Sequence, residues 1–240
     1  MNPLIMIPAR MAATRLPGKP LADIGGKPMI VRAWEQAMAS GFRVAVAAGD
    51  PEIVAAVQAA GGEAVLTDPD LPSGSDRILA AAQAVDPDGA HEVVINIQGD
   101  MPFASPDLAK ACAALLARES ACDIATLVAT EADASDRANP DVVKAVLALP
   151  DGGTSGRALY FTRSTLYGDG PVWRHVGIYG YRREALARFC AAPPSPLEKR
   201  EKLEQLRALE MGLQIWASVI EAAPLSVDNP ADLEAARARA

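Results

Sequence analysis

The chain has 240 residues, a formal net charge of −7 and a pI near 4.9. A chain of this length can bury a complete hydrophobic core without disulfides or structural metals. Its acidic balance, with no basic tract beyond one early loop, argues against a nucleic-acid polymer as a partner. No apolar run reaches the ~18 residues of a membrane-spanning helix, and the first residues do not resemble a signal peptide. We therefore expect a soluble protein without membrane insertion.

The cysteines indicate the compartment. Cys112, Cys122 and Cys190 form an odd set and contain no C-x-x-C pair. They therefore predict neither a disulfide framework nor a zinc site. A reducing, cytoplasmic location fits this usage best.

The first half of the chain alternates strand and helix patterns. The expected strands are 4–7, 43–48, 63–67 and 92–97, and the expected helices are 28–40, 52–60, 76–85 and 105–118. Apolar residues of the first helix recur at helical spacing. The run 92–97 is nearly all β-branched, as a strand buried on both faces should be. This alternation predicts an α/β fold with a mostly parallel, doubly wound, Rossmann-like sheet.

The pattern changes after residue 130. A strand is expected at 124–130, just before this change. Beyond it, strands are expected at 142–149, 157–162, 176–181 and 213–220, and helices at 183–190, 196–210 and from 229 onward. Turns containing glycine and proline, rather than helices, join several of these strands, which predicts antiparallel additions to the sheet. Without an internal repeat or a low-complexity linker, we expect one domain spanning 1–240, with a β-rich part around 140–195.

A cationic loop follows the first strand directly. Arg10, Arg15 and Lys19 lie in the segment 8–20, which contains no carboxylate. Cations gathered in an acidic chain indicate a local polyanion, and a triphosphate is the usual small one. The alternative is a surface loop whose arginines pair with distant carboxylates, at ~0–1 kcal/mol for each pair. The G-x-x-x-x-G-K-[ST] spacing of a phosphate-binding P-loop is absent.

Two carboxylates are candidate metal ligands. Asp100 follows the expected strand 92–97, and ligands bind at the carboxyl ends of strands in open α/β sheets. An oxygen ligand beside a triphosphate suits Mg²⁺, although Asp100 could also serve a turn or a helix cap. Asp228 would supply a second carboxylate, but the spacing does not show that the two meet.

Other polar residues have ordinary structural alternatives. The small-residue turn Ser73 to Arg77 could approach a base or phosphate, or could cap the following helix. His91 lies in a polar turn and is expected at the surface, whereas His175 enters a strand. The charged segment 198–207 is by default a solvated helix face.

Eight motifs, in the expected order, resemble the 3-deoxy-manno-octulosonate (Kdo) cytidylyltransferase family. They are IPAR at 7–10, TRLPGKPL at 14–21, GKPMI at 26–30, NIQGD at 96–100, NPDVVK at 139–144, RHVGIYGY at 174–181, PSPLE at 194–198 and LEQLR at 203–207. The sequence departs from the family pattern at 48–50, where it has Ala-Gly-Asp, and at 166–171, where the loop is short.

The resemblance implies a nucleotidyltransferase fold and transfer of CMP from CTP to the anomeric hydroxyl of Kdo, with release of pyrophosphate, for lipopolysaccharide synthesis. It also implies Mg²⁺ as cofactor, CTP and Kdo as small-molecule substrates, and a homodimer. Two alternatives stay open. The acceptor could be a related acid sugar, such as an amino-Kdo or a nonulosonate, or the chain could be a non-catalytic nucleotide-binding relative.

The resemblance further implies roles for individual residues. The catalytic residues would be Arg10, Arg15, Lys19 and Asp100, and the metal ligands Asp100 and Asp228. The nucleotide would be bound by Pro8, Ala9, Arg10, Lys19, Ser73, Gly74, Arg77 and Gln98. The sugar would be bound by Gln98, Arg163, His175, Tyr179, Glu204 and Gln205. One edge of the charged segment 198–207 would then face the sugar rather than solvent.

Overall fold

The computed structural model describes residues 1–12, 16–130, 134–166, 168 and 170–240. These residues form two compact units, here called the first unit (Met1–Lys110 and Pro224–Ala240) and the second unit (Ala111–Ala223). The sequence predicted one domain with a β-rich part around 140–195. The structure divides the chain differently, because the C-terminal segment packs with the first unit while residues from 111 onward build a core of their own.

The sheet of the first unit is fully parallel. Its strands are β1 (Pro3–Ala9), β4 (Arg43–Ala48), β5 (Glu63–Leu66) and β6 (Val93–Asn96). They lie in the order β5-β4-β1-β6. All four residues of β6 are buried, as expected for a strand covered on both faces. The predicted parallel sheet is confirmed here.

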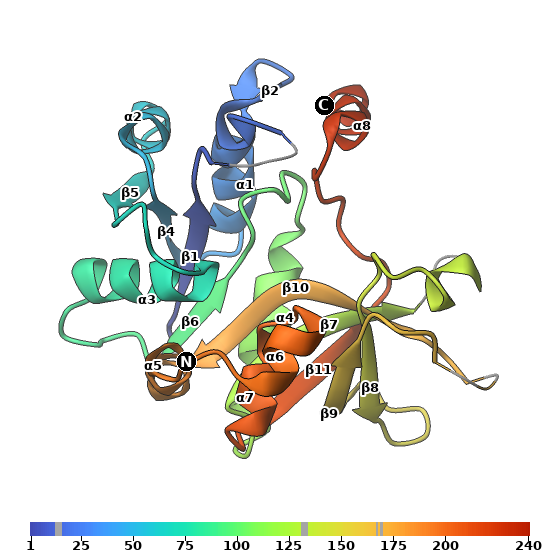
Figure 1. Ribbon diagram of the computed structural model, residues 1–240. Helices are drawn as coiled ribbons and strands as arrows, with labels where there is room; N and C mark the ends of the chain where they lie inside the picture. The colour runs from blue at the N-terminus through green and yellow to red at the C-terminus, as the bar shows by residue number, and fades with distance from the viewer. Residues whose placement is uncertain (13–15, 131–133, 167, 169) are drawn as a thin grey trace. The chain divides into compact units, whose positions relative to one another are not determined.

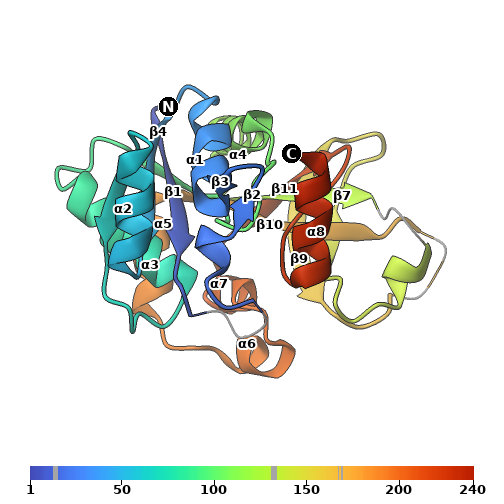
Figure 2. The same ribbon diagram turned by 90° about the horizontal axis from the view of Figure 1, so that it is seen from above.

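Helices cover both faces of this sheet. The crossover helices are α1 (Met29–Met38), α2 (Pro51–Ala59) and α3 (Gly74–Val85). The chain moves outward from β1 through α1 and α2, then returns past β1 to β6 through α3. Because parallel crossovers are right-handed, the change of direction places α3 on the opposite face from α1 and α2, as Figures 1 and 2 show.

Three smaller elements complete the first unit. They are the 3-10 turn η1 (Lys19–Leu21), a hairpin of β2 (Asp23–Ile24) and β3 (Lys27–Pro28), and the C-terminal helix α8 (Pro230–Arg239). The hairpin was not predicted, because its strands are too short to show an alternating pattern. Helix α4 (Pro106–Arg118) contains residues of both units.

The sheet of the second unit is mixed. Its strands are β7 (Ile124–Thr130), β8 (Lys144–Ala148), β9 (Ser155–Thr162), β10 (Trp173–Arg182) and β11 (Ile215–Ile220). They lie in the order β10-β7-β11-β9-β8. Only β7 and β11 run parallel among these neighbours. The start of β10 also pairs with β8, which closes this sheet on itself at one end. The predicted antiparallel additions are confirmed.

The remaining elements of the second unit include one correction. They are η2 (Ala134–Arg137), α5 (Arg183–Ala191), α6 (Pro196–Glu201) and α7 (Gln205–Glu210). The single helix predicted over 196–210 is wrong. Lys202 adopts a left-handed conformation with φ 55° and ends α6. This break lets Arg207 of α7 turn back to Glu198 of α6.

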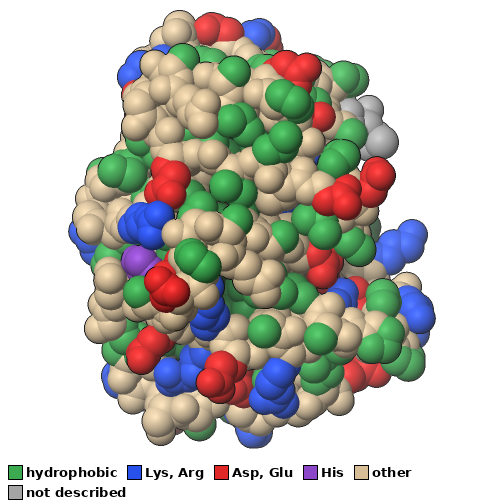
Figure 3. All heavy atoms as spheres, turned by 90° about the vertical axis from the view of Figure 1, so that its left-hand side faces the viewer, with side chains coloured by type: hydrophobic (Ala, Val, Ile, Leu, Met, Phe, Trp, Pro, Cys, Tyr) green, Lys and Arg blue, Asp and Glu red, His purple; other side chains and the backbone are tan. Residues whose placement is uncertain are grey.

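None of the described helices has the length and apolar composition needed to cross a membrane. On the face drawn in Figure 3, acidic and basic side chains are interspersed rather than gathered by sign.

Candidate active site

A cavity of about 260 Å³ opens in the first unit at the carboxyl ends of β1 and β6. The chain order reverses between these two strands, so their connecting loops leave in opposite directions and a crevice forms. The lining residues are Pro8, Ala9, Arg10, Ala12, Lys19, Pro20, Leu71, Ser73, Gly74, Arg77, Gln98, Gly99 and Asp100. All eight residues predicted to bind the nucleotide are among them.

The start of the cationic loop is held by the segment after β4. Gly49 N–H donates to the Ala9 carbonyl at 2.8 Å, and the Asp50 carboxylate accepts from the Met11 N–H at 2.7 Å. A Cβ at position 49 would lie 2.9 Å from an Arg77 guanidinium nitrogen. Glycine at position 49 therefore lets the backbone lie close to the Arg77 guanidinium. The Asp50 side chain holds the backbone of the cationic loop.

Lys19 contacts both predicted metal ligands. Its Nζ lies 2.8 Å from Asp100 Oδ2 and 3.3 Å from Asp228 Oδ1. The segment 8–20 itself contains no carboxylate, so these partners of Lys19 come from residues distant in sequence that folding brings to the loop. Arg10 is exposed at the cavity, and Arg15 lies outside the described residues.

Backbone contacts explain how the two aspartates meet. The Val227 N–H donates to the Asp100 carbonyl at 2.9 Å, which ties the turn after β6 to the segment leading into α8. A Cβ at Gly99 would lie 3.0 Å from the Pro8 carbonyl. The turn therefore packs tightly against β1, and Asp100 is held at the cavity rim.

The two aspartates fit a magnesium ion in donor type. One ammonium group reaches an oxygen of each carboxylate, so both side chains are directed to the same place. Mg²⁺ prefers oxygen ligands and often takes only one or two carboxylates, completing its shell with water and phosphate oxygens. Among the described residues no group of three or more His, Cys, Asp or Glu side chains could hold a metal.

The turn that opens α3 has a structural role as well as a place in the cavity. The Ser73 hydroxyl accepts from the Asp76 N–H at 3.2 Å and so caps the helix. Arg77 is 2 % exposed, and its guanidinium donates to the Thr67 hydroxyl and to the carbonyls of Asp68 and Pro69. Burial, reinforced by the Arg10 cation, lowers the pKa of Arg77. Arg77 therefore also fixes the cavity wall.

In the second unit, a bulge brings two predicted sugar-binding residues together. His175 pairs with Val128 of β7, and Tyr179 pairs with Thr126, so two residues of β10 are inserted between them. Since Val128 and Thr126 share a face, His175 and Tyr179 stand side by side, with ring centroids 5.4 Å apart. The Thr126 hydroxyl donates to carbonyls inside the bulge and lies 3.0 Å from His175 Nε2.

Glu204 and Gln205 lie near the same tyrosine. A small cavity in this unit is lined by Ile124, Tyr179, Tyr181, Phe189, Glu204, Gln205, Ala208 and Ile215. Arg163 is absent from this lining. Its guanidinium donates to the Pro140 carbonyl at 3.0 Å, and its own carbonyl accepts from the buried Lys144 Nζ at 2.7 Å. Four of the five predicted sugar-side residues of this unit are thus neighbours, and Arg163 lies with the 139–144 segment.

Arg207 of α7 connects this helix to α6 and also lies close to Glu204. Its guanidinium donates twice to Glu198, at 2.8 and 2.7 Å, and lies 3.5 Å from Glu204. Residues 198 and 207 would be separated by about 13 Å along an unbroken helix. The Arg207 guanidinium lowers the pKa of Glu198 by hydrogen bonding. The expected solvated face is therefore wrong at Arg207, which is 6 % exposed.

Comparison with known proteins shows the family of this chain. A family model described as cytidylyltransferase matches residues 4–215. A protein from Parvibaculum lavamentivorans named 3-deoxy-manno-octulosonate cytidylyltransferase is 60% identical over 99% of this chain and 92% of its own. A Rhodospirillum rubrum protein of the same name is 53% identical over 98% of this chain and 94% of its own. This chain belongs to the 3-deoxy-manno-octulosonate cytidylyltransferase family.

A solved structure supports the fold of this cytidylyltransferase. The structure of CMP:2-keto-3-deoxy-manno-octonic acid synthetase complexed with CTP has a TM-score of 0.91 and 37% identity. The match covers 100% of this chain and 98% of that one. The nucleotidyltransferase fold predicted from the sequence is therefore confirmed.

Sequence reasoning missed several residues that support the predicted ones. Thr126 lies 3.0 Å from His175 and Arg207 lies 3.5 Å from Glu204, whereas Asp50 holds the backbone of Met11, the residue after Arg10. A polar Thr126 inside the apolar run 124–129 was a usable signal. His91 was expected at the surface, which is wrong: it is 7 % exposed, with Nδ1 3.3 Å from the Asp86 carboxylate.

The acid stability of the cytidylyltransferase should depend on His175. Burial lowers its pKa from 6.5 to about 4. As the pH falls below 6.5, His175 binds a proton in the unfolded chain, whereas in the folded chain it stays neutral until about pH 4. The free energy of unfolding therefore decreases as the pH falls from 6.5 to about 4. In His175→Gln, the loss of unfolding free energy between pH 7 and pH 4.5 should be smaller by roughly 2 kcal/mol.

Urea unfolding of both proteins at the two pH values measures this difference. Equal losses in the wild type and His175→Gln would show that the imidazole does not titrate differently in the two states.

Proposed function

We propose that this protein transfers CMP from CTP to the anomeric hydroxyl of Kdo, forming CMP-Kdo and pyrophosphate. The observation that carries the proposal is the meeting of Lys19 with Asp100 and Asp228 beside the cavity at the ends of β1 and β6. Phosphoryl-group transfer needs positive charge next to oxygen ligands for a metal. The full-length relatives bearing that enzyme name support the substrate pair.

The loop cations would bind the triphosphate. Arg10 is exposed at the cavity, and the Lys19 ammonium can exchange a carboxylate partner for a phosphate oxygen. In the reaction, the sugar oxygen forms a bond to the α-phosphorus, the bond from that phosphorus to the bridging β-phosphate oxygen breaks, and pyrophosphate leaves. Cations stabilise the negative charge that shifts to the leaving group.

We further propose Mg²⁺ as the cofactor, held by Asp100 and Asp228. When bound, it would supply charge neutralisation at the phosphates and lower the pKa of the acceptor hydroxyl. The protein's own contribution is to hold both carboxylates at one place, which the Val227 to Asp100 backbone bond and the Lys19 contacts support.

The acceptor would be held by His175, Tyr179, Glu204 and Gln205 of the second unit, together with Arg163 of the same unit. His175 is neutral at pH 7 because burial lowers its pKa to about 4, so its imidazole can exchange hydrogen bonds with hydroxyls without carrying charge. The Glu204 carboxylate can accept from sugar hydroxyls. Arg163 would supply the cation that suits a sugar carboxylate.

The test is an assay of pyrophosphate release. We expect product only when CTP, Kdo and Mg²⁺ are all present, and loss of activity on addition of EDTA with recovery on excess Mg²⁺. Kdo should be preferred over an amino-Kdo and a nonulosonate when kcat/KM values are compared. Absence of pyrophosphate with folded protein and all three components would refute the proposed function, and a higher kcat/KM for another acid sugar would change the acceptor.

We also propose a cytoplasmic homodimer. Free thiols at Cys112 and Cys122 are buried, which suits a reducing compartment, and dimerisation follows the family resemblance. Light scattering of the purified protein tests the second point, for which a mass near 50 kDa is expected from the 25.1 kDa chain.

A further inference from the structure

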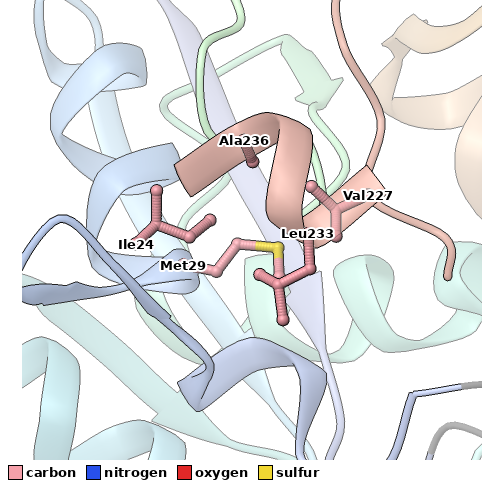
Figure 4. Packing of buried hydrophobic residues seen from close by; sticks show 5 residues of the cluster. All are labelled: Ile24, Met29, Val227, Leu233 and Ala236. Carbon is pink, nitrogen blue, oxygen red and sulfur yellow. The ribbon is translucent and has the colours of Figure 1, made fainter. Parts of the chain in front are cut away.

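Helix α8 is anchored on the first unit by an apolar cluster. Leu233 and Ala236 of α8 pack with Val227, with Ile24 of the β2–β3 hairpin and with Met29 at the start of α1. Figure 4 shows these side chains directed toward one another from the three segments. All five are at most 7 % exposed. The anchor places the N-terminus of α8, and the residues just before it, at a defined position.

The side chain of Asp232, in the first turn of α8, binds the backbone of Asp228. One oxygen, Oδ2 of Asp232, accepts from the Asp228 N–H at 2.9 Å and from the Asn229 N–H at 3.1 Å. In return, the Asp232 N–H donates to the Asn229 side chain at 3.0 Å, which completes a capping box. The bond to the Asp228 N–H lies outside the usual capping box. Asp232 therefore holds the backbone of the residue whose carboxylate contacts Lys19.

We propose that Asp232 is a positioning residue for the metal ligand Asp228, acting through its hydrogen bond to the Asp228 backbone. The proposal rests on the proposed function, in which Asp100 and Asp228 hold Mg²⁺. Ser226 supports the same geometry, since its hydroxyl donates to Asp228 Oδ2 at 3.3 Å. Groups that orient a metal ligand commonly change metal affinity 10- to 100-fold when removed.

The direct test is binding of Mn²⁺ to the full-length protein, followed by the electron paramagnetic resonance signal of the free ion. Asp232→Ala should raise the Kd for Mn²⁺ about tenfold. Asp232→Asn should stay within about twofold of the wild type, because its amide oxygen can take the place of the one oxygen that accepts both N–H groups. Asp228→Asn provides the reference for loss of a ligand.

Asn229→Ala is the matched control. It removes the capping bond from the Asp232 N–H but leaves the acceptor of the Asp228 N–H in place. Its Kd for Mn²⁺ should change by less than about threefold, although this variant removes one half of the capping box and Asp232→Ala removes the other. The Mg²⁺ concentration needed for half-maximal turnover should rank the variants in the same order as the Kd for Mn²⁺. The KM for Kdo should change little.

Three results would overturn the proposal. An equal rise of the Kd for Mn²⁺ in Asp232→Ala and Asn229→Ala would show that the effect comes from helix capping. An equal rise in Asp232→Asn and Asp232→Ala would show that it comes from the charge of Asp232. Unchanged Mn²⁺ binding in Asp232→Ala would also refute it. If Asp232→Ala does not fold, Asp232→Ser replaces it. The serine hydroxyl is one atom closer to the backbone than the carboxylate oxygen, so it should not reach the Asp228 N–H as Asp232 does. A wild type that binds Mn²⁺ but makes no pyrophosphate would refute the proposed function instead.

Discussion

Replacing Asp100 with asparagine should lower kcat about 1000-fold while leaving the fold intact. The carboxylate is the proposed metal ligand nearest β6, and metal ions contribute several kcal/mol to such transition states, with 1.36 kcal/mol for each factor of ten. The Asp100 carbonyl that accepts from Val227 is unchanged by the substitution, and the amide oxygen can still accept from Lys19. Steady-state pyrophosphate release measures kcat, and thermal unfolding checks the fold.

Asp107→Asn is the matched control for this experiment. Asp107 also lies in the first unit, at the start of α4, but its side chain is 78 % exposed and its carboxylate lies 3.2 Å from the exposed Lys110 ammonium. Its kcat should equal that of the wild type. Turnover by Asp100→Asn at the wild-type rate would rule out a metal role for Asp100.

Replacing Lys19 with methionine should lower kcat about 100-fold, or ~2.7 kcal/mol, with a smaller change in KM for Kdo. The proposed partner of the ammonium is phosphate charge, which shifts toward the leaving group in the transition state. A group that acts mainly in the transition state changes kcat more than substrate binding. Initial rates over a grid of CTP and Kdo concentrations separate the two constants.

Lys27→Met controls for the loss of a lysine from the same region. Lys27 pairs with Glu35 at 2.7 Å, but both side chains are well exposed, at 49 % and 40 %. Such pairs contribute only ~0–1 kcal/mol to stability, so activity should be retained. A rise in KM for Kdo with kcat unchanged in Lys19→Met would contradict the assignment of Lys19 to the phosphates.

Local sequence patterns were sufficient for most elements. The strand expected at 43–48 is β4 with the same bounds, and the helix expected from 105 to 118 is α4 within one residue. The strand is a short, mostly apolar run, and the helix has a clear start signal in Ser105 and Pro106. The fold class followed from the alternation of such elements, because a parallel sheet requires crossover helices between its strands.

The pattern failed where a long-range contact outweighed local preference. The residues 196–210 have helical spacing throughout, yet the chain turns at Lys202 with a left-handed φ of 55°. The strained residue is compensated by the buried pairing of Arg207 with Glu198 and by burial of Leu203. No local rule shows that a charged side chain nine positions away will become a partner.

The sequence by itself determined most of the strands, the crossover helices, the family and which residue types could carry the chemistry, because these depend on periodicity and on short motifs. Only the tertiary structure decided that Lys19 meets Asp100 and Asp228, which lie 81 and 209 positions away. It also decided that Asp232 holds Asp228 and that α8 belongs to the first unit. The physical reason is that these contacts come from packing of distant segments, which leaves no trace in local spacing.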